Sequence, residues 1–570
     1  MKRCPQCNRV EPDVKLAFCR IDGTPLVSNS SSFNPDANTA GFESGPVSSE
    51  TQTEILQHRT DTEINRVTAP TTVLSKTAGA AKESRRLKQL SSAILITAVG
   101  LGVAALAGYL YVSRRSNVSI QSIAVLPFEN ASGNADLDYL SEGVSESVLD
   151  RLSQLPQLKV IARSSSFRYR GNNLDLKKVA DSLGVQAIVT GRVVQRGDSY
   201  LIRVDVTDVG ENKQLWGENF TRKMSDLQIM QTDISREIAE NLSLRLNESQ
   251  RQPPVKQPTS AQAYELVLKA VFYRNKGSAE DLKKSIECYQ QAITIDPNYA
   301  LAYAGLADSY RTSGLDAKEN LQKREAAARK ALELDDNLAE AHFSMGQYQR
   351  DLWQWQEAGR EFQRAMQLNP NASHAYSGYS GVLSLLGRHD EAINADKRAK
   401  ELDPVGIIQN TVAGRTLHYA RRYDEAIEQL KKTIDLDPRT SFAYVRLADV
   451  YVTTGRYQEA IAQYEKAIEL GTASSEAKIR LAAAYAKMGE RQRSLDIMKQ
   501  LQNSGDYISP AHLAIFYAAL GDREQAFATL EKGYSERSPS LQSVKVDPAF
   551  DSLRSDPRFQ DLLRRMGLSQ

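Results

Sequence analysis

Three patterns of hydrophobic and polar positions divide the chain into regions of different structure. Residues 90–112 form an apolar run without a charged side chain, and a run of this length predicts a helix that crosses a lipid bilayer. Between residues 120 and 223, apolar and polar positions alternate in short segments, which predicts half-buried strands. From residue 261 onward, apolar residues recur at helical spacing. The sequence therefore predicts a multidomain protein of the α and α/β classes.

The charges that flank the apolar run predict its orientation. More basic residues precede the run than follow it: Lys82, Arg85, Arg86 and Lys88 against Arg114 and Arg115. Because positive residues favour the cytoplasmic side, we expect a single-pass inner-membrane protein. Its N-terminus would be cytoplasmic, and its C-terminal domains periplasmic or otherwise extracytoplasmic. A buried helix of a globular domain is the alternative.

Small residues recur every four positions within the apolar run, at Gly100, Ala104 and Gly108. Such a stripe lets two membrane helices pack closely, as in a homo-oligomer. The alternative is the ordinary small-residue content of a membrane span. The sequence therefore leaves the oligomeric state open.

Three of the four cysteines stand at the start of the chain, at a spacing that suits a metal ion. Cys4 and Cys7 form one knuckle, and Cys19 with Asp22 forms a second; together they resemble a short zinc ribbon. Thiolates and a carboxylate are acceptable ligands of tetrahedral zinc, so we expect one structural zinc ion here. A degenerate ribbon that binds no metal is the alternative, because Asp22 replaces the usual fourth cysteine.

Composition sets the remaining boundaries and excludes one class of function. The 72 Lys and Arg residues against 70 Asp and Glu leave a net charge of +2, which argues against a dedicated nucleic-acid binder.

The segment after the zinc-ribbon-like head is rich in Ser and Thr, as disordered tethers are, and its sequence leaves open whether it is phosphorylated. The predicted regions are a zinc-ribbon-like head (1–26), a disordered linker (27–88), a transmembrane helix (89–113), an α/β domain (117–249), a linker (250–260), a repeat region (261–540) and a C-terminal cap (541–570).

The predicted α/β domain combines strands with helices at about 138–153, 175–183 and 225–247. Its strands read SIAVLPFEN, KVIARS, QAIVTGRVVQR, SYLIRVDVTDV and KQLWGENFTRK. The stretch from about 117 to 247 resembles the TolB amino-terminal or FlgO-like domain. The resemblance implies an interaction role in the cell envelope and no catalytic residues.

The sequence lacks the constellations of side chains that mark common enzymes. Ser164, Ser165 and Ser166 would end a strand, but no histidine lies between His58 and His342 to activate a hydroxyl. The phosphate loop of nucleotide hydrolases and the motifs of kinases are also missing. We therefore predict that the protein is not an enzyme.

A period of 34 residues runs through the second half of the chain. Small residues and prolines both follow it: Ala358, Ala392, Ala426, Ala460 and Ser494, and Pro370, Pro404 and Pro438. This period is the signature of tetratricopeptide repeats, in which each unit is a pair of helices, and the small residues belong to helix packing. We count about eight units, at roughly 261–297, 298–336, 337–370, 371–404, 405–438, 439–472, 473–506 and 507–540.

Stacked helix pairs curl into a superhelix with an extended concave binding surface, lined by the first helix of each unit. The 34-residue frame points six side chains toward this groove: Phe343, Arg350, Arg415, His418, Phe442 and Asp449. Cations, aromatic rings and a carboxylate together suit a peptide or helix of a partner protein. The alternative for each of them is a solvated surface residue.

These observations predict a non-enzymatic, membrane-anchored scaffold or sensor that binds protein or peptide partners through an exported tetratricopeptide solenoid. The alternative is a transmembrane transcription or signalling regulator that acts through its cytoplasmic head. Neither the ligand nor the pathway can be read from the sequence.

Overall fold

The computed structural model describes residues 120–171, 173–242, 258, 260–312, 317–471 and 474–568, together with three short strands near the N-terminus. Met1–Leu101 and Gly102–Gln570 are two separate compact units. In the first unit, β1 (Lys2–Arg3) pairs antiparallel with both β2 (Val10–Glu11) and β3 (Val27–Ser28). Strand β3 takes in the first two residues of the segment predicted to be a linker.

The predicted zinc ligands and the predicted transmembrane helix lie outside the described residues, as does the rest of the first linker. The side chains concerned are Cys4, Cys7, Cys19 and Asp22 in the head and Gly100, Ala104 and Gly108 in 89–113. Within the part of the chain that the structure describes, no helix combines the length and apolarity needed to cross a bilayer. The zinc site and the membrane span therefore stay predictions.

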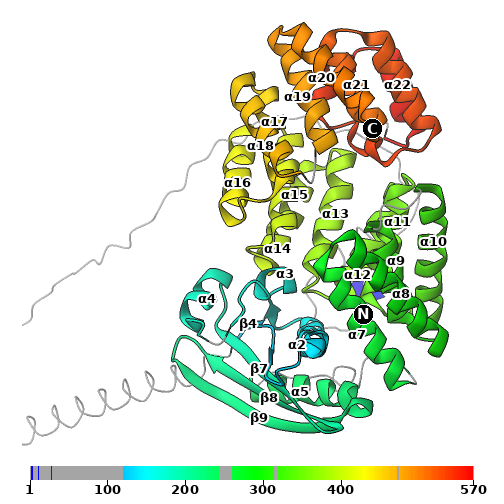
Figure 1. Ribbon diagram of the computed structural model, residues 1–570. Coiled ribbons are helices and arrows are strands. Elements are labelled where there is room, and N and C mark those ends of the chain that lie inside the picture. The colour runs from blue at the N-terminus through cyan, green and yellow to red at the C-terminus, as the bar shows by residue number, and fades with distance from the viewer. Residues whose placement is uncertain are drawn as a thin grey trace, which may run out of the picture. The chain divides into compact units, whose positions relative to one another are not determined.

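A mixed sheet forms the region that begins at residue 120 (Figure 1). The main strand order is β6-β4-β7-β8-β9, with β5 paired to β7. Strand β4 runs parallel to β6 and β7, while β8 and β9 extend the sheet as antiparallel hairpins. This sheet confirms the predicted α/β region. The strands are β4 (Ser122–Val125), β5 (Glu129–Asn130), β6 (Lys159–Val160), β7 (Ala187–Arg196), β8 (Ser199–Asp208) and β9 (Lys213–Lys223).

Helices cover both faces of the sheet because successive strand residues point to opposite sides. Ile123 of β4 is buried in one core with helices α2 and α5, while its neighbour Ala124 is buried in a second core with α4. Parallel strands need both faces covered, which explains their continuous apolar runs. The helices of this region are α2 (Asp138–Ser153), α3 (Arg163–Ser166), α4 (Leu176–Leu183) and α5 (Leu227–Asn241), with short 3-10 turns η1 (Ala135–Leu137) and η2 (Met224–Asp226).

The rest of the described chain is an array of helix pairs (Figure 1), and each of the eight predicted repeat ranges holds one pair. From the third unit onward, the units therefore follow the 34-residue period of the sequence. The helices are α7 (Ala261–Lys276), α8 (Ala279–Ile295), α9 (Ala300–Thr312), α10 (Ala317–Leu334), α11 (Ala339–Asp351), α12 (Trp355–Leu368), α13 (Ser373–Leu386), α14 (His389–Leu402), α15 (Ile407–Tyr419), α16 (Tyr423–Leu436), α17 (Ser441–Thr453), α18 (Tyr457–Glu469), α19 (Ser474–Met488), α20 (Arg491–Asn503), α21 (Pro510–Leu520) and α22 (Arg523–Ser535).

The periodic small residues are buried where helices cross. Ala358, Ala392, Ala426, Ala460 and Ser494 all have no exposed surface. Gly387 and Gly455 end first helices with φ of +85° and +75°, a left-handed conformation that glycine adopts without strain. The repeated positions are thus structural, as the sequence predicts.

The side chains of Asn371 and Asp403, in loops between repeats, join these loops to the α/β region. The Asn371 side chain donates to the carbonyls of Ser153 and Leu158 at 2.8 and 2.9 Å. Asp403 accepts hydrogen bonds from the hydroxyls of Ser164 and Ser165, each at 2.5 Å. Two of the three serines considered as nucleophiles therefore hold two parts of the fold together, whereas the Ser166 hydroxyl donates to the nearby Ala162 carbonyl.

The C-terminal segment folds back along earlier repeats. It comprises η3 (Pro539–Ser543), η4 (Pro548–Leu553) and α23 (Pro557–Arg565). Trp355 Nε1 donates to the Met566 carbonyl at 2.9 Å, and Lys545 Nζ donates to the Leu386 carbonyl at 2.8 Å. The segment therefore does more than cap the last unit, because it also contacts units far earlier in the chain.

Candidate functional site

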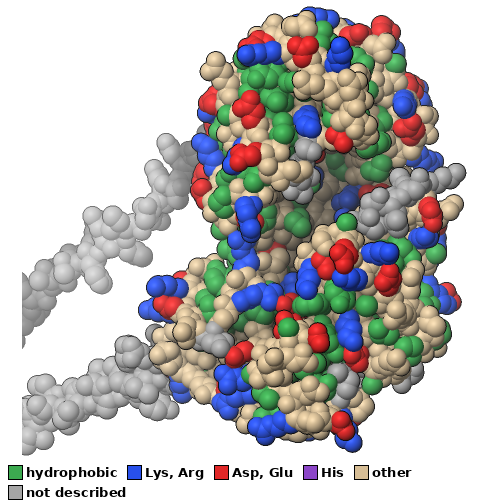
Figure 2. Space-filling model, in the orientation of Figure 1, with side chains coloured by type: hydrophobic (Ala, Val, Ile, Leu, Met, Phe, Trp, Pro, Cys, Tyr) green, Lys and Arg blue, Asp and Glu red, His purple; other side chains and the backbone are tan. Residues whose placement is uncertain are grey.

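First helices of neighbouring units contact one another directly and form the inner layer of the array: α9 with α11, α11 with α13, α13 with α15, α15 with α17 and α17 with α19. Figure 2 shows the molecule hollowed beside these repeats, with basic side chains on the wall of the hollow. All six side chains predicted to face the groove come from α11, α15 and α17. Their surroundings differ, and they fall into three groups.

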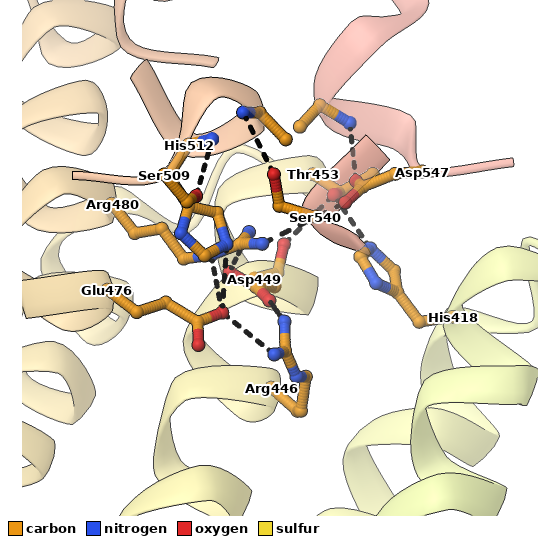
Figure 3. Close-up of polar contacts among 12 residues, drawn as sticks. His418, Arg446, Asp449, Thr453, Glu476, Arg480, Ser509, His512, Ser540 and Asp547 are labelled. Atoms are coloured by element: carbon orange, nitrogen blue, oxygen red, sulfur yellow. Dashed lines mark hydrogen bonds and ion pairs between the residues drawn. The ribbon is translucent and has the colours of Figure 1, made fainter. Parts of the chain in front are cut away.

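Asp449 and His418 belong to a buried polar network on the inner layer (Figure 3). Asp449 is 6% exposed. Its carboxylate accepts hydrogen bonds from Arg480 at 2.8 Å, from Arg446 at 3.0 Å and from the Tyr464 hydroxyl at 2.7 Å. These charges are paired in the folded protein and are therefore not free to bind a ligand.

The network extends to the next repeat through Glu476, which pairs with Arg446 at 2.8 Å and with Arg480 at 3.1 Å. His512 of α21 lies 3.3 Å from the same carboxylate. The C-terminal segment adds Asp547, whose carboxylate lies 3.9 Å from Arg480 (Figure 3). The inner layer at α17 to α21 is thus sealed by the protein's own C-terminal segment.

The pKa values in the network follow from burial and pairing. Burial opposes the charge on Glu476, but Arg446, His512 and Arg480 hold its pKa well below the usual value. Burial lowers the pKa of His418 to about 4, although Asp547 and Asp449 act against it. His418 Nε2 lies 2.9 Å from Thr453 Oγ1, whose hydroxyl donates to the Asp449 carbonyl. The imidazole is therefore neutral at pH 7, and its Nε2 is the donor.

Stability should fall as pH drops, because His418 is kept neutral by burial. An unfolded histidine takes up a proton below its ordinary pKa of about 6.5, whereas folded His418 does so only near pH 4. Between these values the unfolded state binds more protons, so the folded state loses about 2 kcal/mol from this group on going from pH 7 to pH 5. Urea unfolding at both pH values measures the loss, and His418→Gln should show a smaller pH dependence than the wild type. An unchanged dependence would contradict the assignment.

Arg350 and Arg415 lie outside this sealed network. The Arg350 side chain is 22% exposed, and its Nη2 is 3.6 Å from Asp351 Oδ1. Arg324 of α10 contacts the same carboxylate at 2.8 Å. Among the described residues, no hydrogen bond or ion pair engages the Arg415 guanidinium. Both predicted arginines thus keep hydrogen-bonding capacity on the inner layer.

The two predicted aromatic residues lie in opposite environments. Phe343 is partly buried and contacts the His374 ring edge-on at 4.4 Å between centroids. Phe442 stands at the start of α17 with 48% of its surface exposed. Phe343 therefore belongs to the packing of the repeats, whereas Phe442 is open to solvent.

Several network residues went unpredicted although the sequence holds a signal for two of them. Arg446 and Arg480 stand 34 residues apart, so the repeat frame places them at the same position of successive units. No residue of the same type stands 34 positions from Glu476, His512 or Asp547. In the residues that the structure describes, no group of His, Cys, Asp and Glu is suited to hold a metal ion.

Comparison with known families supports the repeat assignment. The family model described as "Tetratricopeptide repeat" matches residues 343–407 and 411–476, and the one described as "TPR repeat" matches 278–314. Residues 278–314, 343–407 and 411–476 are thus similar to tetratricopeptide repeats. Residues 119–240 match a model described as "HilA/YgeH-like transcriptional regulator, second domain". The predicted resemblance to TolB amino-terminal or FlgO-like domains covers the same stretch and stays a prediction.

The similar proteins each match only part of this chain. "Putative adenylate cyclase 3" of Rhizobium meliloti (strain 1021) is 29% identical over 235 residues, which are 39% of each chain. The chain thus spans about two fifths of the length of this curated relative. Among solved structures, YrrB, "a TPR protein with an unusual peptide-binding site", is 23% identical over 33% of this chain and 93% of its own, with a TM-score of 0.25. A thermophilic TPR protein of Thermus thermophilus, TTC0263, is 21% identical over 32% of this chain and 98% of its own, with a TM-score of 0.30.

Proposed function

We propose that this protein is a non-enzymatic scaffold or sensor that binds protein or peptide partners through the inner layer of its tetratricopeptide repeats. Extended concave surfaces are the binding surfaces of such arrays. The supporting observation is that buried polar atoms without hydrogen-bond partners gather on the middle repeats: Gln347 Oε1, Gln349 Oε1, Arg350 Nε, Ser377 Oγ, Ser384 Oγ, Gln409 Oε1 and Ser441 Oγ among the described residues. Buried polar groups in native proteins normally find a partner, so a bound partner would explain them.

The proposal includes membrane anchoring through residues 90–112 and a structural zinc ion on Cys4, Cys7, Cys19 and Asp22, both of which rest on the sequence. In this arrangement the repeats would bind a partner on the exported side and the single helix would link them to the cytoplasmic head. Metal analysis of the purified full chain tests the zinc ion, since one zinc per chain is expected and none would remove it from the proposal.

Site-specific photocrosslinking tests partner binding. A photoreactive amino acid replaces Arg415 on the inner layer of the full chain, and in a control it replaces Arg360, which is exposed on α12 and pairs with Glu357. We expect crosslinked protein adducts in cells from the Arg415 position and none from the Arg360 position. Absence of adducts at Arg415, or equal labelling at both positions, would overturn the proposed function.

The match of residues 119–240 to a domain of transcriptional regulators favours one second candidate, a regulator whose cytoplasmic head acts on DNA. The net charge of +2 argues against it. A gel-shift titration of the full chain at several salt concentrations separates the two, because phosphate contacts give an affinity that falls steeply with salt. The proposed function does not include adenylate cyclase activity, which appears only in the name of the curated relative.

A further inference from the structure

Two arginines share one carboxylate on the inner layer, and a third arginine from another helix lies near them. Arg324 of α10 and Arg350 of α11 both approach Asp351, at 2.8 and 3.6 Å. Arg415 of α15 has no hydrogen-bond or ion-pair partner in the described part of the chain, yet it lies near enough to Arg350 to act on its charge. The cluster therefore holds more positive than negative charge.

The donors of this arginine cluster (Arg324, Arg350 and Arg415) are incompletely used. Arg324 is 8% exposed, and its Nη2 has no hydrogen-bond partner. The Nε of Arg350 is also buried and without a partner. A buried donor left without an acceptor has lost its hydrogen bonds to water and gained none in return, so these groups favour a ligand that supplies acceptor oxygens.

Repulsion within the cluster supports the same conclusion. Burial lowers the pKa of Arg350, and Arg311, Arg415 and Arg324 lower it further against the opposing effect of Asp351. Besides Asp351, the carboxyl of Asp396 interacts with the cluster through Arg415, and burial raises its pKa to about 6. This carboxyl is largely ionised at pH 7, so Asp351 and Asp396 together still leave one of the three guanidinium charges unbalanced.

The sealed network at α17 to α21 shows what a self-sufficient cluster looks like in this protein. There, Arg446 and Arg480 meet three carboxylates, those of Asp449, Glu476 and Asp547. The C-terminal segment supplies Asp547 to that network, but toward Asp351 it directs the Gln542 amide, at 3.1 Å. The arginine cluster thus receives an amide where its neighbour receives a carboxylate.

We infer that Arg324, Arg350 and Arg415 form an anion subsite that receives an acidic side chain from an extended segment of a partner protein. Guanidinium groups bind carboxylates through paired hydrogen bonds, and the unused donors match that demand. The inference rests on the proposed function and adds the chemistry of the partner. A protein segment is favoured over nucleic acid because one basic cluster in a chain of net charge +2 cannot follow a phosphate backbone.

Helix α13 lies beside Arg350 of the cluster. A Cβ placed on Gly381 of α13 would lie 3.9 Å from Arg350 Nη1, an ordinary contact distance. One turn further along α13, the buried Ser384 hydroxyl has no hydrogen-bond partner. Helix α13 therefore places a glycine, which has no side chain, next to Arg350, and an unpartnered hydroxyl one turn away.

The test uses the full chain and a fluorescent decapeptide of glutamate, with the glutamine decapeptide as the neutral probe. We expect the glutamate peptide alone to bind, and Arg350→Gln and Arg415→Gln to weaken it by about tenfold each, since a charged hydrogen bond of about 1.5 kcal/mol corresponds to that factor. The matched control Arg360→Gln, on the outer helix α12, should leave affinity unchanged. Equal binding of both peptides, no binding of either, or an equal loss in the control would overturn the inference.

Thermal unfolding of the same variants separates binding from structure. Because the cluster carries unneutralised charge, Arg350→Gln/Arg415→Gln should unfold at the same or a higher temperature than the wild type while losing the peptide. A purely structural role would instead lower the unfolding temperature.

Inorganic phosphate that binds as tightly as the glutamate peptide would also overturn the inference, because it would show a small-anion site. Crosslinked adducts at Arg415 without any charge dependence of binding would remove the inference and leave the proposed function standing.

Discussion

Replacing Asp449 with alanine should destabilise the protein by about 3 to 5 kcal/mol, the range observed when one partner of a buried ion pair is removed. Asp449 accepts hydrogen bonds from Arg480, Arg446 and the Tyr464 hydroxyl. The alanine variant leaves two guanidinium groups and a hydroxyl in a buried site without that acceptor. Urea unfolding of the full chain, followed by circular dichroism, measures the change in the free energy of unfolding.

The control for this experiment is Asp435→Ala. Asp435 is exposed near the end of α16, so its removal should change stability by no more than about 0.5 kcal/mol. A loss below about 1 kcal/mol for Asp449→Ala would mean that the network in Figure 3 is open to water in solution. Asp449 would then return to the set of groove residues that a partner could bind.

The repeat architecture could be predicted from the sequence because helix packing requires small residues at regular positions, and these positions give the 34-residue period. A small residue recurs every 34 positions where two helices cross, and Ala392 and Ala426 are both fully buried. The hairpin strands were likewise predictable, because apolar and polar positions alternate along β8, whose Ile202, Val204 and Val206 are buried in one core. Local pattern and tertiary burial agree in both cases.

The path of the C-terminal segment could not be predicted in the same way. Trp355 and Met566 are 211 residues apart and hydrogen-bonded, and a repeat period says nothing about which distant units meet. The 34-residue frame places Asp449 and His418 on the inner layer, but it cannot show that Asp547 lies beside them. The 34-residue frame therefore predicts which positions lie on the inner layer, but not which of them the C-terminal segment covers.

At one buried position of the repeat, a carboxyl replaces the apolar side chain found in the neighbouring units. Asp396 stands 34 residues after Phe362 and 34 before Leu430, both fully buried apolar residues. Asp396 is itself 3% exposed. This carboxyl thus occupies a core position, and the charge of Arg415 acts on its pKa. It belongs to the same middle repeats as the arginine cluster.

Replacing Phe550 with alanine should destabilise the protein by about 3 to 5 kcal/mol, the cost of emptying a buried aromatic site. Phe550 is 1% exposed and shares a core with Trp355, Tyr419 and Phe559. This core holds the C-terminal segment against helices of the third and fifth units. Besides lowering the free energy of unfolding, the variant should speed proteolysis after residue 538, because a loosened segment exposes its backbone.

Phe442→Ala is the matched control, since this phenylalanine is 48% exposed and its loss should change stability by no more than about 0.5 kcal/mol. Equal stability and equal proteolysis of the Phe550→Ala variant and the wild type would show that the segment is not packed in solution. If the segment does loosen, Asp547 withdraws from Arg480, and the sealed half of the inner layer loses one negative charge while Arg480 stays paired with Asp449. The glutamate peptide should then bind Phe550→Ala at least as tightly as the wild type, because the binding face of the arginine cluster would continue into α17 and α19.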